Sequence, residues 1–178
     1  MMKSDIIKRL KKNKYNLYLI CIGIVLSIFL ISFVKDKVSN LNLRKYDNDI
    51  LIIKDNDNIQ KSYSLKELRK NKEIKEKIRL NNGREEVDVT GVALEKILGN
   101  LSYKLDESPE IAVEDSLGNI TNLPMSVALE VNRIIIVYKI NGKANKDYDD
   151  SLGTFTLIDR NSKNKESWIK DAKVLNIQ

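Results

Sequence analysis

The side chains that most often carry out acid–base and metal chemistry are scarce in this sequence. The 178 residues contain no histidine and a single cysteine, Cys21. Because histidine is the commonest general base and metal ligand, every catalytic arrangement that needs an imidazole is excluded. One cysteine allows neither an internal disulfide nor a cysteine-based zinc site. We therefore expect no catalytic residue and no metal-ligating residue in this chain.

The remaining candidates are charged or aromatic side chains, and each has a structural alternative. A small acidic cluster at Asp147, Asp149 and Asp150 could hold a cation, or it is a solvated loop. Trp168 could stack on a ligand or pack in a core. Three cations could bind an anion in a cleft or lie solvated at strand ends: Arg79, Arg133 and Lys139. No glycine-rich phosphate loop, nucleophile elbow or paired-carboxylate motif is present.

An uncharged run at residues 15–34 dominates the first part of the chain. At about 1.5 Å of rise per residue, a helix of this length spans about 30 Å, the thickness of the hydrocarbon core of a bilayer. A helix satisfies its own backbone hydrogen bonds, so it can lie in lipid. We expect a transmembrane helix that contacts membrane lipid over residues 15–34.

The charges beside this run predict its orientation. Residues 1–14 are basic, and the positive-inside rule places such a flank in the cytoplasm. The apolar run is longer than the core of a cleaved signal peptide, so we expect an uncleaved signal-anchor. Residues 35–48 then form a helical stalk or a flexible linker. Residues 49–178 form an extracytoplasmic domain of a single-pass protein in the cell membrane, which we place in a bacterial envelope.

The net charge of +6 arises mostly from the flank of the membrane segment. Residues 1–34 carry a charge of +5, and the remaining 144 residues carry 25 basic and 24 acidic side chains. Binding to nucleic acid needs a basic patch on the folded part. The outer domain has no basic excess, so we expect no nucleic-acid partner.

The outer domain alternates short strands with short helices. Ser64 and Glu67 form a capping box before a short helix, and Thr90 is placed to cap a helix that ends at Gly99. Asn82–Gly83 and Asn141–Gly142 are two-residue turn signals. Strands are predicted at 49–54, within a hairpin over 75–89, and at 110–113, 120–123, 133–140, 154–158 and 167–177. This order predicts an α+β domain with a mixed or mainly antiparallel sheet.

A series of short motifs, in this order, resembles the molybdopterin-binding domain of the sulfite-oxidase type of oxidoreductases. The motifs are Tyr63–Leu68, Thr90–Leu98, Val113–Gly118, Ile136–Gly142, Gly153–Ile158 and Ser167–Lys170. The resemblance extends over residues 49–178 and implies the sulfite-oxidase-like fold. It also implies a cofactor cleft, for which the candidate residues in this sequence are Arg79, Asn82, Asp115 and Asn141.

The sequence departs from that family at the metal ligand. The family ligates molybdenum through a cysteine at the end of the strand before the Gly–Val–x–Leu helix, where this chain reads Ile78–Gly83 without a cysteine. The resemblance therefore implies the fold rather than the chemistry. We expect a non-catalytic module that binds a small ligand or another envelope protein, without a cofactor. The alternative is a molybdopterin-dependent oxidoreductase or an electron-transfer accessory with an unusual cofactor site.

Overall fold

The computed structural model describes residues 18–31, 41–99, 101 and 110–178. The chain divides into two compact units, Met1–Asn40 and Leu41–Gln178. In the first unit, residues 18–31 form an α-helix. Among the described residues, no helix is long and apolar enough to cross a membrane. The predicted basic segment, both ends of the uncharged run and the first part of the predicted stalk lie outside the described residues.

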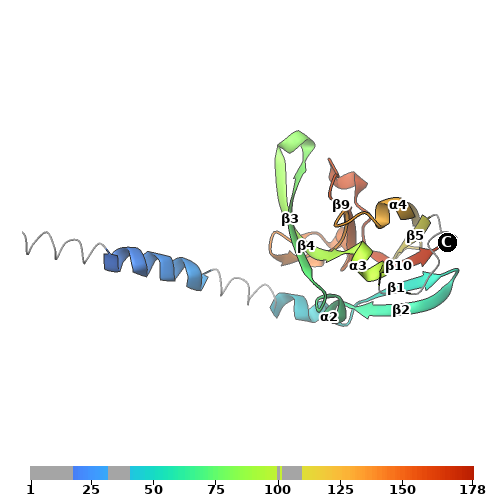
Figure 1. Ribbon diagram of the computed structural model, residues 1–178, viewed down its shortest axis with the longest axis horizontal. Coiled ribbons are helices and arrows are strands. Elements are labelled where there is room, and N and C mark those ends of the chain that lie inside the picture. The colour runs from blue at the N-terminus through green and yellow to red at the C-terminus, as the bar shows by residue number, and fades with distance from the viewer. Residues whose placement is uncertain (1–17, 32–40, 100, 102–109) are drawn as a thin grey trace, which may run out of the picture. The chain divides into compact units, whose positions relative to one another are not determined.

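The second unit contains two five-stranded sheets (Figure 1). The strand order in the first sheet is β2-β1-β10-β5-β6. Its strands are β1 (Ile50–Asp55), β2 (Asn58–Ser64), β5 (Glu110–Asp115), β6 (Ile120–Pro124) and β10 (Ala172–Ile177). Only the β1–β10 pair is parallel among these neighbours, so the sheet is mixed. That pair brings the first and last strands of the domain together.

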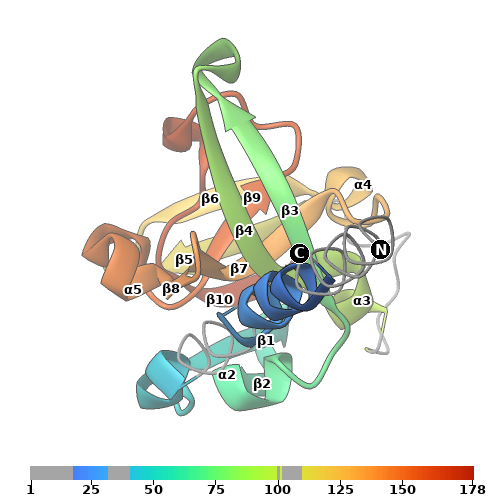
Figure 2. The same cartoon turned by 90° about the vertical axis from the view of Figure 1, so that its left-hand side faces the viewer.

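The second sheet has the order β3-β4-β7-β8, and β9 also pairs with β7. Its strands are β3 (Glu73–Leu80), β4 (Glu85–Ala93), β7 (Ile134–Ile140), β8 (Lys143–Ala144) and β9 (Thr156–Asp159). Every residue of β7 is buried, and its bounds confirm the strand predicted at 133–140. The long β3–β4 hairpin rises at one side of the domain (Figure 2), and Ile78, Leu80 and Val87 near its end are buried in a core cluster.

The helices are short and lie in the connections between strands. The α-helices are α2 (Leu65–Leu68), α3 (Leu94–Leu98), α4 (Met125–Ala128) and α5 (Asn145–Tyr148). The 3-10 turns are η1 (Arg44–Tyr46), η2 (Asn81–Gly83), η4 (Asp150–Leu152) and η5 (Lys165–Ser167). The α2 helix has the predicted capping box, because Ser64 Oγ accepts from Glu67 N and the Glu67 carboxylate accepts from Ser64 N. Together with the two sheets, these helices confirm the α+β class.

Two hydrophobic clusters form the core of this unit. The larger cluster includes Leu51, Leu94, Ile136 and Phe155, and it lies between the two sheets and the short helices. The smaller cluster includes Ile78, Leu80, Ile158 and Trp168. Trp168 is 4% exposed, so it is a core residue. Leu43 is also buried, so the segment before β1 packs on the domain.

Three local predictions were wrong. Thr90 lies inside β4, and α3 begins after Ala93 without a side-chain cap. The hairpin at Asn82–Gly83 has a four-residue loop, because Leu80 pairs with Glu85. The last strand begins at Ala172 and not at 167, because Ile169 pairs with Leu157 and the chain then turns at Asp171, where φ is +46°. In contrast, Asn141–Gly142 forms the predicted two-residue turn between β7 and β8.

Candidate functional site

The four residues predicted to line a cofactor cleft lie in different surroundings. Arg79 is on β3 with its side chain 77% exposed, and it pairs with Glu86. Asn82 is in the loop at the end of the β3–β4 hairpin. The Asn141 carboxamide oxygen accepts from the Asp88 N–H at 2.9 Å, which joins the β7–β8 turn to β4. Asp115 ends β5 and, of the four, is the one that lines a cavity described below.

Asp115 organises the turn between β5 and β6. Its carboxylate accepts hydrogen bonds from Leu117 N at 2.8 Å, Asn119 N at 2.9 Å and Asn119 Nδ2 at 2.8 Å. The pKa of Asp115 is lowered, chiefly by the Asn119 side-chain amide and then by the backbone N–H groups of the turn. Hydrogen bonds that are donated to a carboxylate stabilise its charged form and thereby lower its pKa. Asp115 is therefore a turn-forming carboxylate at the edge of a cavity.

The end of β3 is where the resemblance noted in the sequence implies a metal ligand, and Ile78–Gly83 contains no thiol. Leu80 is fully buried in the smaller core cluster, and the Asn81 N–H donates to the Lys163 carbonyl at 2.7 Å. Molybdenum sites of this type need a thiolate donor, and the only cysteine of the chain is Cys21. Within the described part of the chain, no group of three His, Cys, Asp or Glu side chains could hold a metal ion. These residues do not fit a thiolate-ligated molybdenum centre.

Of the other charged candidates, Asp147 and Arg133 form ion pairs, and Asp149 accepts a hydrogen bond from Ser151 N at 3.0 Å. Asp147 accepts from Lys45 Nζ at 2.6 Å and from Tyr46 Oη at 2.9 Å, which lowers the pKa of Asp147. These contacts hold the segment before β1 on α5. Arg133 pairs with Glu130 and, at 3.1 Å, with Asp159, and both contacts raise the pKa of Arg133. Lys139 is buried within β7.

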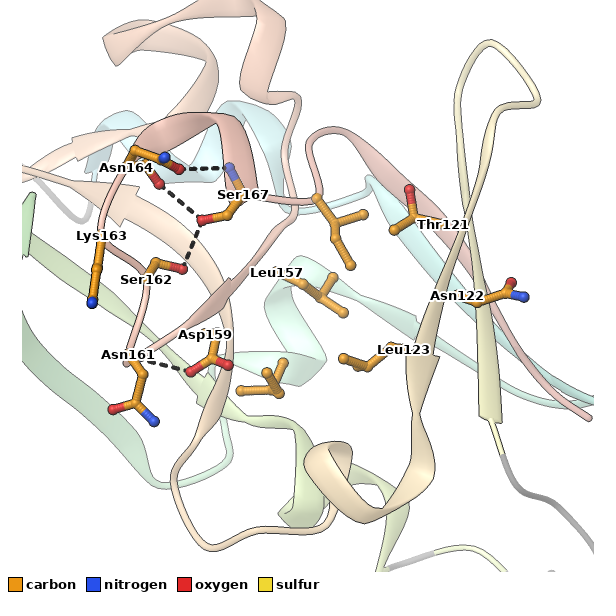
Figure 3. A pocket seen from close by; sticks show the side chains of 12 residues that line it. Thr121, Asn122, Leu123, Leu157, Asp159, Asn161, Ser162, Lys163, Asn164 and Ser167 are labelled. Atoms are coloured by element: carbon orange, nitrogen blue, oxygen red, sulfur yellow. Dashed lines mark hydrogen bonds between the residues drawn. The ribbon is translucent and has the colours of Figure 1, made fainter.

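A cavity of about 470 Å³ opens between β6 and the segment that follows β9 (Figure 3). Its apolar floor comes from β6, β7, β9 and the bridge at Ile169, and its polar wall comes from residues 159–167. The lining residues are Thr121, Asn122, Leu123, Ile134, Leu157, Asp159, Asn161, Ser162, Lys163, Asn164, Ser167 and Ile169.

A second cavity of about 380 Å³ adjoins the first. Both are lined by Thr121 and Ile169, and the second also reaches Asp115, Trp168 and Lys170. We call the two cavities together the β6 groove. The buried Trp168 Nε1 has no hydrogen-bond acceptor among the described residues. A buried donor without an acceptor is uncommon in folded proteins, and it lies beside this part of the groove.

The polar wall is a preorganised loop. Ser167 N donates to Asn164 Oδ1 at 3.2 Å, and Ser167 Oγ bonds to the Asn164 carbonyl at 2.9 Å and to Ser162 Oγ at 3.1 Å (Figure 3). The loop is also tied to the β3–β4 hairpin by the Asn81–Lys163 hydrogen bond and the Lys165–Glu85 ion pair. The end of the β3–β4 hairpin therefore supports one wall of the groove.

Sequence reasoning missed most residues of this groove. Residues 159–167 form an unbroken run of polar and charged side chains between two short apolar segments, and this run was the available signal. It was not recognised because its partner wall, Thr121–Leu123, is distant in the sequence. The predicted strands 110–113, 120–123, 133–140, 154–158 and 167–177 all contribute lining residues, but of these residues only Trp168 was considered as a ligand contact.

Comparisons with known proteins show the fold and no more. No protein-family model matches this sequence, and no curated protein gives a significant match. One solved structure with a similar fold is the sulfane dehydrogenase SoxCD from Paracoccus pantotrophus. The match has 17% sequence identity and a TM-score of 0.57, and it covers 74% of this chain but 38% of the other. At this identity, the likeness supports a sulfite-oxidase-like fold alone.

Proposed function

We propose that this protein is a membrane-anchored binding module that displays a non-catalytic, sulfite-oxidase-like domain outside the cell. Its ligand, a small molecule or a segment of an envelope protein, would occupy the β6 groove. The observation that carries this proposal is the groove itself, which combines an apolar floor with a wall of amide and hydroxyl groups. Ligand sites are typically concave and mostly apolar, with a few convergent polar groups.

The groove is better suited to binding than to catalysis. Its first cavity has one carboxylate, Asp159, which Arg133 Nε contacts at 3.1 Å and to which Asn161 N donates at 2.8 Å. General acid–base chemistry needs a side chain whose pKa lies near the working pH, and the chain has no histidine. Amide and hydroxyl groups give orientation and specificity instead.

The anchoring part of the proposal rests on the sequence. Residues 15–34 carry no charge, and the basic residues on their amino-terminal side favour a cytoplasmic N-terminus. The protein would be a single-pass signal-anchor protein with residues 35–178 outside the membrane. Its groove would then meet ligands of the envelope and not those of the cytoplasm.

A second candidate function is a molybdopterin-dependent oxidoreductase or electron-transfer accessory with an unusual cofactor site. The fold shared with a sulfane dehydrogenase favours it. The absence of a thiol from residues 35–178 weighs against it, because a cofactor would then be held without the thiolate that ligates molybdenum in the related family.

Metal and pterin analysis separates the two candidates. The full-length chain would be purified in detergent from a host that makes the molybdenum cofactor, and molybdenum and oxidised pterin would be measured per chain. A sulfite-oxidase-type enzyme produced in the same host is the loading control. We expect both ratios to lie far below one for this chain. A ratio near one would overturn the non-catalytic proposal and favour the oxidoreductase.

A further inference from the structure

Among the described residues, no strand pairs with the outer main-chain edge of β6. This strand is the last of its sheet, and its neighbour is β5. Asp115 N donates to the Asn119 carbonyl at 3.1 Å, and the register pairs Val113 with Thr121 and Ile111 with Leu123. Hydrogen-bonded and non-hydrogen-bonded pairs alternate along antiparallel strands. Ile120 and Asn122 therefore direct their main-chain N–H and C=O groups away from β5.

This outer edge borders the β6 groove. Thr121, Asn122 and Leu123 all line the first cavity, although successive side chains of a strand point to opposite faces. Leu123 points toward the cavity, whereas the Asn122 side chain points away and donates to Glu110 at 3.0 Å (Figure 3). Consecutive residues line one cavity only when the cavity runs along the edge of the strand.

The shape and chemistry of the groove suit an extended chain beside β6. One side offers the main-chain groups of β6, and the opposite wall offers the side chains of Asn161, Ser162 and Ser167. The floor between them is apolar, with Leu123, Leu157 and Ile169. A strand placed here would direct alternate side chains onto that floor and the others toward solvent.

The charges around the groove favour an uncharged occupant. The acidic lining residues are Asp115, Asp159 and Glu166, and the basic ones are Lys163 and Lys170. Arg133 already pairs with Asp159, and donors of the β5–β6 turn surround Asp115. A strongly charged ligand would find no excess of opposite charge in the groove. The electrostatics of the groove are therefore complementary to an uncharged chain.

We propose that the β6 groove binds an extended, uncharged peptide segment, which adds to the sheet as a strand beside β6 and places alternate apolar side chains on the groove floor. This inference rests on the proposed binding function and names the chemical class of its ligand. Pro124, which has no N–H, ends the available edge. The added strand would therefore pair with Ile120 and Asn122.

The test compares two versions of one peptide that differ only in which main-chain edge can donate hydrogen bonds. Segments of about eight residues, without charged residues or tryptophan, would be selected from a display library on the full-length chain in lipid nanodiscs. Two N-methylated versions of the best binder would then be made. One version is methylated at alternate residues whose N–H groups point to one edge of the extended peptide, and the other version at the residues whose N–H groups point to the opposite edge. Binding would be measured through the emission of Trp168, the only tryptophan of the chain.

Strand addition predicts an asymmetric result. Methyl groups on the edge that faces β6 remove main-chain hydrogen bonds and weaken binding by about tenfold or more relative to methyl groups on the other edge. Equal weakening by the two methylated versions would overturn strand addition. Failure to select any peptide would overturn a peptide ligand, while a molybdenum-free chain would leave the non-catalytic proposal in place.

Two neighbouring substitutions locate the binding site. Thr121→Phe fills the groove without adding a second tryptophan and should weaken peptide binding by about tenfold or more. Ile120→Phe introduces the same side chain on the opposite face, where Ile120 is 65% exposed, and should change affinity by less than about twofold. Far-ultraviolet circular dichroism and thermal unfolding confirm that both variants fold. Equal affinities for both variants and the wild type would place the peptide elsewhere and overturn the proposal.

Discussion

At the scale of single residues, Asp115 connects the turn between β5 and β6 with the wall of the groove. Its carboxylate accepts from two backbone N–H groups and one side-chain amide. An asparagine here would replace one acceptor oxygen by an amide that faces the Asn119 amide. We therefore expect Asp115→Asn to lower the free energy of unfolding at pH 7, measured by urea denaturation, and Glu114→Gln on the same strand to have little effect.

The same carboxylate predicts how the stability difference between wild type and Asp115→Asn changes with pH. Because the folded-state pKa of Asp115 is lowered, the carboxylate contributes stability above its unfolded-state pKa of about 3.9. That contribution is lost as the pH falls through the folded-state value. The difference between wild type and Asp115→Asn should therefore be largest near neutral pH and shrink in acid. A difference that grows as the pH falls would contradict the assigned role.

At the scale of elements, Gly91 sets how closely β4 approaches β7. The register between these strands shifts between Thr90 and Gly91. A Cβ atom at Gly91 would overlap the Ile136 carbonyl and lie 2.7 Å from Ile135 Cγ2. In an open strand, Gly→Ala restricts the unfolded chain and stabilises a protein. Here the overlap reverses that sign, because the neighbour is backbone of the central strand.

We expect Gly91→Ala to lower the free energy of unfolding by about 1 to 3 kcal/mol, the usual cost of overpacking. Ser62→Ala, on the exposed edge strand β2, is the control and should stay within about 0.5 kcal/mol. Urea denaturation of both variants, with equal slopes, measures the difference. An unchanged or raised stability in Gly91→Ala would show that β4 and β7 can separate at this point.

The elements also show why some features could be predicted from sequence and others could not. The Ile134–Tyr138 run predicts a buried strand because its own side chains determine its burial, and the capping box is set within four residues. The two Asn–Gly signals gave different loops. Asn141–Gly142 forms a two-residue turn, but the loop after Leu80 is longer, because Asn81 N bonds to the distant Lys163 carbonyl. The groove depends on such distant contacts and was therefore missed.

At the scale of the whole molecule, the start of the domain is held in two ways. Its first strand, β1, pairs in parallel with its last strand, β10, and the residues before β1 make contacts of their own. Asp47 pairs with Arg69 at 3.0 Å, and Lys45 pairs with Asp147 at 2.6 Å. These contacts and the buried Leu43 fix the chain on the domain before β1 begins.

The proposed orientation in the membrane can be tested with the single cysteine of the chain. In a Cys21→Ser background, we expect Ser62→Cys to react with a membrane-impermeant maleimide in intact cells, because Ser62 is exposed on β2 in the part proposed to lie outside. Ser4→Cys, in the basic segment, should react only after the membrane is permeabilised. The reverse pattern would put the groove in the cytoplasm, where envelope ligands could not reach it. Release of the chain by an alkaline wash would contradict the anchor, since only lipid burial of residues 15–34 retains it against that wash.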